Sequence, residues 1–189
     1  TMTQGQYEAL KAAVKNHRNI LVIGGTGSGK TTLVNAIINE MVICDPMERV
    51  FIIEDTGEIQ CAAENFVQYH TSLEVPMTAL LKATLRMRPD RILVGEVRGA
   101  EALDLLDAWN TGHEGGAATL HANNAAAGLA RLRSLITRNE SAPAEIEPLI
   151  GEVVHVVVHI ARTPEGGRRI QEILEVSGYV DGRYITKTL

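Results

Sequence analysis

Short apolar runs alternate with amphipathic segments through most of the chain. Buried strands are predicted from the apolar, β-branched runs at residues 20–23, 49–53, 91–95 and 117–120, with a further short strand at 67–70. Helices are predicted from apolar positions at helical spacing at residues 4–16, 32–41, 77–86, 100–109 and 125–137. Strands that alternate with helices are typical of an α/β fold with a mainly parallel sheet.

The pattern changes near the carboxyl end. A short helix is expected over residues 141–150, and the apolar run at 153–161 predicts a strand. A turn at 163–167 and alternation over 168–176 predict an antiparallel partner. Asp181-Gly182 stands between alternating residues, which is typical of a β-hairpin. We therefore predict one domain, residues 1–189, with a leading helix within 1–18 and an antiparallel end at 153–189.

A glycine-rich segment follows the first predicted strand. It fits the P-loop pattern G-x-x-x-x-G-K-[ST], and it lies between a strand and a helix as that motif requires. Its candidate nucleotide-binding residues are Gly25, Thr26, Gly27, Ser28, Gly29, Lys30, Thr31 and Thr32. A glycine-rich turn that binds nothing would not need a lysine and a threonine in this register.

The expected chemistry of this segment is phosphate binding. Glycines let backbone N–H groups point inward at phosphate oxygens, and the helix N-terminus adds a partial positive charge. Lys30 would reach the β- and γ-phosphates, and the Thr31 hydroxyl would ligate Mg²⁺. Thr32 would face either the helix packing or the α-phosphate. The motif thus predicts ATP and Mg²⁺ as cofactors.

Acidic residues end two of the predicted strands. Residues 92–96 resemble a Walker B strand in which Gly95 stands where an aspartate is usual, so Glu96 would act alone, through a metal-bound water. Glu54 is the preferred residue to polarise the attacking water. Asp55 and Glu58 remain alternatives for that role or would hold the loop, and all three approach the phosphates if their strand lies beside the first strand.

Arginine and histidine residues lie close to the same strand ends. Arg86, Arg88 and Arg98 flank the Glu96 strand, and Arg98 is the preferred catalytic arginine, although structural ion pairs are an alternative for each. His121 ends the strand at 117–120, where it could sense the γ-phosphate by a hydrogen bond.

Composition narrows the possible classes of protein. Net charge is −5, and dispersed basic residues argue against a broad nucleic-acid surface. No run of about 18 apolar residues is present to span a bilayer. Cys44 and Cys61 show no metal-site spacing and indicate a reducing compartment. His155 and His159 lie on one strand, about 13 Å apart at four residues of about 3.3 Å, too far to share an ion, so both are interpreted as packing or interface residues.

Four motifs together resemble one known family. They are Gly24 to Thr32, Ile53 to Glu58, Ile92 to Arg98, and Thr119 to Asn123, and residues 85–91 add to the likeness. The chain is similar to the secretion (traffic) ATPase superfamily of type II and type IV secretion, pilus retraction and conjugation. Within it, the chain looks most like the conjugal-transfer ATPases of the TrbB group and their type IV secretion relatives.

The resemblance implies a RecA-like P-loop core that hydrolyses ATP within a homohexameric ring. By motif match, Lys30 and Thr31 bind phosphate and Mg²⁺, Glu54 is the catalytic glutamate, Glu96 the Walker B acid and His121 the His-box residue. It further implies inner-membrane partners of the secretion machine, a cytoplasmic location peripheral to the bacterial inner membrane, and no direct nucleic-acid contact. Family members carry an N-terminal domain that is expected to be absent from this chain and that contributes to the pocket and the ring.

Three alternatives remain open from the sequence. A RecA-like nucleic-acid translocase would show DNA-stimulated turnover. A nucleotide-gated docking module would hydrolyse ATP too slowly for a motor. A small-molecule kinase would need a lid and a substrate pocket, and neither is evident in the sequence.

Overall fold

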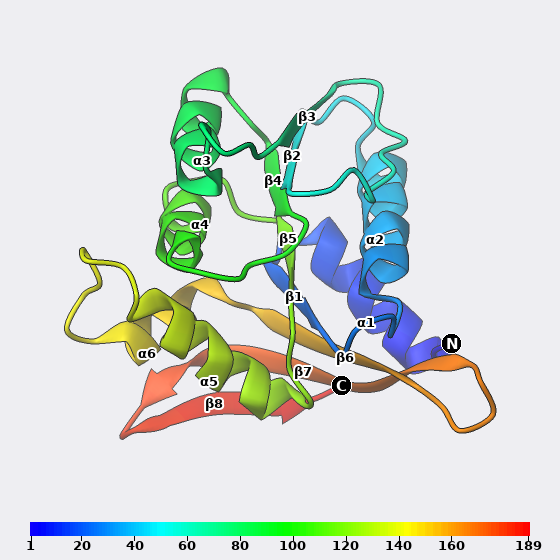
Figure 1. Cartoon of the computed structure of the whole chain (residues 1–189). Coiled ribbons are helices and arrows are strands. Elements are labelled where there is room, and N and C mark those ends of the chain that lie inside the picture. Colours follow the sequence, from blue (N-terminus) through cyan, green and yellow to red (C-terminus); the bar gives the residue numbers. More distant parts are fainter.

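The computed structural model describes all 189 residues, and an eight-stranded sheet runs through the molecule (Figure 1). The strands are β1 (Ile20–Ile23), β2 (Val50–Glu54), β3 (Phe66–His70), β4 (Arg91–Val94), β5 (Ala117–Leu120), β6 (Val156–Arg162), β7 (Arg168–Val180) and β8 (Arg183–Thr188). Their order across the sheet is β3-β2-β4-β5-β1-β6-β7-β8. The strands from β3 to β6 are parallel, while β7 and β8 pair antiparallel. The predicted α/β class with a small antiparallel end is thereby confirmed.

Helices cover both faces of the sheet. They are α1 (Gln4–Lys15), α2 (Lys30–Cys44), α3 (Met77–Thr84), α4 (Glu101–Asn110), α5 (Ala125–Ile136) and α6 (Ile146–Val153), and a 3₁₀ turn (Leu85–Met87) follows α3. Figure 1 shows α1 and α2 on one face and the other four helices on the opposite face. No helix combines the length and apolar character needed to cross a bilayer.

The two faces enclose separate hydrophobic cores because successive strand residues point to opposite sides. In β1, Ile20 and Val22 pack into the core under α1 and α2, whereas Leu21 and Ile23 pack into the core under the other helices. The four residues of β1 are all buried, which explains why the parallel strands read as unbroken apolar runs.

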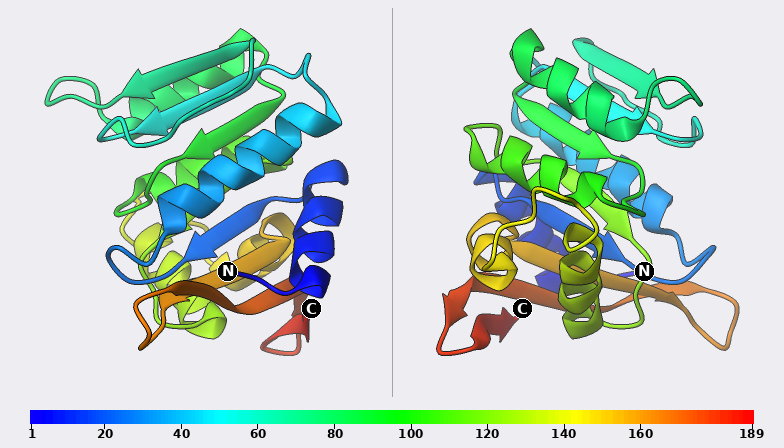
Figure 2. Two further views of the ribbon diagram at one scale, coloured as in Figure 1. Left: turned by 90° about the vertical axis from the view of Figure 1, so that its right-hand side faces the viewer. Right: turned by 60° about the vertical axis from the view of Figure 1, so that its left-hand side comes forward.

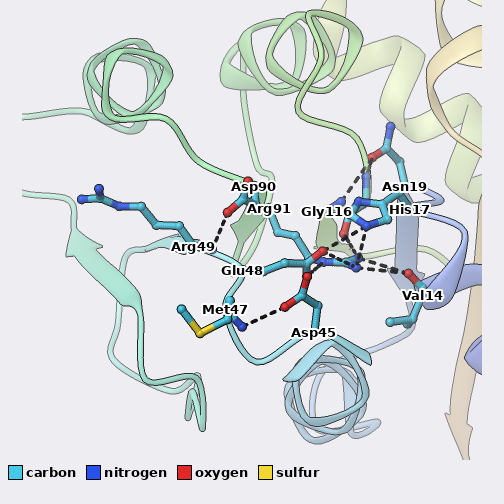
Figure 3. Close-up of polar contacts among 11 residues, drawn as sticks. Val14, His17, Asn19, Asp45, Met47, Glu48, Arg49, Asp90, Arg91 and Gly116 are labelled. Carbon is cyan, nitrogen blue, oxygen red and sulfur yellow. Dashed lines mark hydrogen bonds and ion pairs between the residues drawn. The ribbon is translucent and has the colours of Figure 1, made fainter. Parts of the chain in front are cut away.

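The end of the sheet where the parallel strands begin is held by a buried arginine, Arg91 (Figure 3). Its guanidinium pairs with both carboxylate oxygens of Glu48, and it donates to the carbonyls of Gly115 at 3.0 Å and Val14 at 3.3 Å. His17 Nε2 lies 3.0 Å from Glu48 Oε1. The Arg91 side chain, on β4, therefore joins three other parts of the fold: the end of α1, the segment before β2 and the loop before β5.

Two sequence predictions need correction. The helix expected at 141–150 occupies Ile146–Val153, with Pro148 in its first turn, where a missing N–H is tolerated. The helix takes Val153 from the apolar run, because the Val154 N–H donates to the Ile150 carbonyl. The strand therefore begins at Val156, whose N–H donates to the Asn19 carbonyl at 3.1 Å. The Asp181-Gly182 hairpin is confirmed, with positive φ values of 51° and 77°.

The acidic residues at and after the end of β2 were expected near the phosphates if their strand lay beside the first strand, β1. β2 does not lie beside β1, because β4 and β5 separate them. The carboxyl ends of all the parallel strands nevertheless meet at one edge of the sheet, so residues after β2 still reach the loop after β1.

Candidate active site

The loop between β1 and α2 has the backbone that a phosphate cradle needs. Gly27 and Gly29 adopt φ values of +68° and +100°, which favour glycine, and Gly29 caps α2. Gly24 has no room for a side chain, since a Cβ there would lie 2.2 Å from the Ile160 carbonyl oxygen. The glycines thus serve both the turn and its close packing against β6.

Lys30 is buried at the start of α2. Its ammonium donates to the carbonyls of Gly24 and Gly25, each at 3.0 Å. Burial lowers the pKa of Lys30, although the nearby carboxylates of Glu96 and Glu58 act in the opposite direction. The side chain therefore folds back over its own loop, where an anion would compete with the two carbonyls.

Glu58 reaches the P-loop from the segment after β2. The Thr31 hydroxyl donates to Glu58 Oε2 at 3.2 Å. Thr31, which the sequence assigns to the metal ion, therefore already contacts a carboxylate. This carboxylate belongs to Glu58 and not to Glu96, which the sequence assigned to the metal together with Thr31.

Glu54 is buried at the end of β2, with a relative exposure of 3%. Its Oε2 accepts from the N–H groups of Glu58 and Ile59 at 3.2 Å each. Its Oε1 accepts from Gln68 Nε2 at 2.5 Å, and His70 Nε2 lies 3.6 Å away. Three hydrogen bonds thus fix the orientation of this carboxylate, and the His70 ring lies beside it.

Glu96 is held between two basic side chains. Arg98 Nη2 donates to its Oε2 at 2.8 Å, and His121 Nε2 lies 3.0 Å from its Oε1. Burial would raise the pKa of Glu96, but Arg98, His121 and Lys30 outweigh it, and the pKa is lowered. The hydrogen bond and charge of Glu96 raise the pKa of Arg98, whose Nη1 also lies 3.2 Å from Asp55 Oδ2.

These residues surround one cleft of about 500 Å³. The sequence-predicted residues that line it are Thr26, Gly27, Gly29, Lys30, Thr31, Thr32, Glu54, Asp55, Glu58, Glu96, Arg98 and His121. Gly25 and Ser28 belong to the loop but do not line the cleft, and the buried Ser28 hydroxyl has no hydrogen-bond partner. Arg86 and Arg88 lie outside the cleft.

Sequence reasoning missed two side chains of this region. Gln68 on β3 contacts Glu54, and Arg168 at the start of β7 lines the cleft. A polar residue inside a short predicted strand was the only sequence signal for Gln68. Arg168 had none, because its approach to the P-loop depends on how β6 and β7 pair with the rest of the sheet.

A strand, a phosphate-type loop and a helix, together with acids at neighbouring strand ends, define a P-loop nucleotide-binding protein of RecA-like fold. The family model described as "Type II/IV secretion system protein" matches residues 1–175. The chain belongs to this family of secretion system proteins.

Individual relatives agree with this assignment. The chain is 50% identical over 186 residues to the conjugal transfer protein TrbB of Rhizobium radiobacter, covering 98% of this chain and 57% of that protein. It is 40% identical over 172 residues to the type IV secretion system protein PtlH of Bordetella pertussis, covering 85% of this chain and 50% of that protein. The chain thus spans about half the length of these relatives.

A solved structure shares the fold. The VirB11 ATPase of the Brucella suis type IV secretion system, in complex with sulphate, superposes with a TM-score of 0.82 at 36% identity, covering 89% of this chain and 52% of that chain. Secretion ATPases of type IV systems are therefore what the chain resembles in both sequence and structure.

Proposed function

We propose that this chain is the ATP-hydrolysing domain of a type IV secretion or conjugation motor. The observation that carries the proposal is the convergence of Lys30, Thr31, Glu54 and Glu96 on one cleft, from segments far apart in sequence. The family assignment and the secretion, conjugal-transfer and ATPase roles of the relatives support the same reaction and the same kind of machine.

The loop residues bind and orient the triphosphate. The backbone N–H groups of the loop and the N-terminus of α2 would face the phosphate oxygens. The Lys30 ammonium would leave the carbonyl oxygens of Gly24 and Gly25 and bind the β- and γ-phosphates. The exchange restores strong charge-assisted hydrogen bonds to a buried ammonium, which favours binding.

The residues present also fit a magnesium ion. Thr31, Glu58 and Glu96 line the same cleft and supply the oxygen donors that Mg²⁺ prefers. Bound Mg²⁺ would neutralise charge on the β- and γ-phosphates. Thr31 and Glu96, the latter through a water, would hold it, and Glu58 is added by its contact with Thr31.

The remaining residues act on the attacking water and on the developing charge. Glu54 is fixed by the backbone N–H groups of Glu58 and Ile59, so its carboxylate can orient a water without moving. Arg98 and His121, which pair with Glu96 and line the same cleft, would stabilise the charge that develops on the γ-phosphate.

The motor is further proposed to work as a homohexameric ring on the cytoplasmic face of the bacterial inner membrane. Inner-membrane components of the secretion machine are its proposed partners, and the N-terminal domain carried by longer family members would complete the ring. A net charge of −5 supports contact with protein partners rather than with nucleic acid. Mass in solution with and without ATP and Mg²⁺ tests ring formation, and DNA-stimulated turnover would favour the translocase instead.

Phosphate release from ATP tests the reaction itself. The chain should hydrolyse ATP with Mg²⁺, and Lys30→Ala should reduce turnover by about 100-fold or more. Lys15→Ala is the matched control, because Lys15 is an exposed lysine in the last turn of α1. Wild-type turnover in Lys30→Ala would refute the mechanism, and absence of nucleotide binding by the unmodified chain would refute the function.

A further inference from the structure

The turn between β6 and β7 brings two arginines to the P-loop. Arg162, the last residue of β6, donates from Nε to the Gly27 carbonyl at 3.0 Å, and Arg168, the first of β7, donates to the same oxygen at 3.3 Å. Figure 2 (left) shows this turn, in orange, projecting on the same side of the molecule as the blue loop between β1 and α2. A segment outside the parallel core therefore touches the centre of the phosphate cradle.

Packing ties these arginines to the glycines of the motif. A Cβ on Gly27 would lie 2.6 Å from Arg162 Nη2, and a Cβ on Gly29 would lie 2.6 Å from Arg168 Cδ. The bare Cα atoms of the loop are thus the surfaces on which the two side chains rest, and the register Arg162↔Arg168 places both on one face of the hairpin.

The charges around Arg162 and Arg168 indicate what kind of ligand the two guanidinium groups would bind. Neither guanidinium forms an ion pair with a carboxylate, and both converge on a single neutral oxygen. Each uses only Nε there, so the Nη groups keep the donors that bind phosphate oxygens in pairs. Arg168 also lines the cleft. Two neighbouring cations without an anion, at the rim of a phosphate cradle, suit a polyphosphate ligand.

We propose that Arg168 contacts the phosphates of the bound nucleotide from the β6–β7 hairpin of the same chain, and that Arg162 is a positioning residue that holds the Gly27 carbonyl. The proposal rests on the proposed function, since it concerns the same site. It assigns to the antiparallel end of the fold a direct part in nucleotide binding.

Titration calorimetry of the whole chain at fixed salt, with ADP and with inorganic tripolyphosphate as ligands, tests this role. Arg168→Gln should weaken binding of both ligands by about tenfold or more, because a charge-assisted hydrogen bond to phosphate is lost. Arg169→Gln is the matched control: it removes the same charge from the next residue, which pairs with Ala161 and points to the opposite face of β7. Arg168→Lys should recover part of the affinity.

The positioning role of Arg162 is tested by a double-mutant cycle. Arg162→Gln should weaken binding in the wild-type background and have little further effect when Arg168 is already glutamine, because Arg162 acts by holding the Gly27 carbonyl that also anchors Arg168. Equal affinities of Arg168→Gln and Arg169→Gln would overturn the inference while leaving the proposed function intact. Additive effects of the two substitutions in the cycle would contradict the positioning role of Arg162. If the unmodified chain bound neither ligand, the proposed function would fail first.

Discussion

Gly95 lies directly against the side chain of Glu54. A Cβ on Gly95 would stand 2.7 Å from the Glu54 Cβ and 3.4 Å from its Oε2. The sequence showed a glycine where a Walker B strand usually carries an aspartate, and this contact supplies the physical reason. There is no room for a side chain after the end of β4, because the side chain of Glu54, from the adjacent β2, fills the space.

Gly95→Asp should therefore damage the site rather than improve it. The added carboxylate would displace Glu54 and place a second negative charge beside it, so ATP turnover should fall by about 100-fold or more. Turnover and ADP affinity of the purified variant measure the effect, and affinity should fall much less than turnover, because the P-loop is untouched.

Gly5→Ala serves as the control for adding a side chain to a glycine, since a Cβ there meets nothing within 4 Å. Turnover of Gly95→Asp equal to that of Gly5→Ala would show that the space beside Glu54 is not needed for catalysis.

Gln68 should affect the chemical step through Glu54. Its Nε2 donates both to Glu54 Oε1 and to the Ile59 carbonyl, so it fixes the carboxylate and the following loop together. Gln68→Met keeps similar volume but removes both donors, and we expect kcat for ATP to fall by about tenfold with KM little changed. Gln171→Met is the control, because Gln171 is exposed on β7. A KM effect without a kcat effect would contradict a role in orienting Glu54.

The parallel core could be predicted because its strands and helices each carry a strong local signal. The buried strands read as continuous apolar runs, and the P-loop glycines specify a turn between strand and helix. The same signal misled at residues 153–155, where a run of valines and a histidine looks like strand from its first residue. Helix α6 continues into that run, and tertiary hydrogen bonds to the Asn19 carbonyl decide where the strand begins.

Contacts across the sheet were beyond local reasoning. Residues at the ends of parallel strands could be grouped at one edge, so the convergence of Glu54, Glu96 and His121 on one cleft could be predicted from their positions. The partners that orient them could not: Gln68 reaches Glu54 only because β3 pairs with β2 in register. Arg91 was predicted as part of a strand, but nothing in its surroundings along the chain indicated that Glu48 would neutralise it in the interior.

Glu48→Ala should destabilise the fold strongly. The change leaves the buried guanidinium of Arg91 without its counter-charge, which typically costs about 3–5 kcal/mol of unfolding free energy. The pair Arg133–Glu147, at 2.5 Å and with side chains 52% and 26% exposed, provides the comparison. Glu147→Ala should cost less than about 1 kcal/mol, because a solvated pair contributes little. Urea unfolding measures both, and similar losses in the two variants would contradict the importance of burial.

His155 should make the fold weaker in mild acid. Its ring Nδ1 accepts the Asn19 N–H at 2.9 Å, where β1 and β6 begin, so the folded protein needs the neutral ring. Burial and the charge of Arg18 lower the pKa of His155 below its ordinary value of 6.5, against an opposing effect of Glu114. Because the unfolded chain then binds more protons, the stabilisation is present above about pH 6.5 and is lost as pH falls through the folded-state pKa.

Urea unfolding at pH 7.5 and pH 5.5, compared between the wild type and His155→Asn, isolates this contribution. An asparagine oxygen can accept the Asn19 N–H without titrating, so the variant should lose less unfolding free energy between the two pH values than the wild type does. His159, whose pKa is also lowered by burial, titrates in both proteins and cancels in the comparison. An equal loss in the two proteins would show that protonation of His155 does not disturb the junction of β1 and β6.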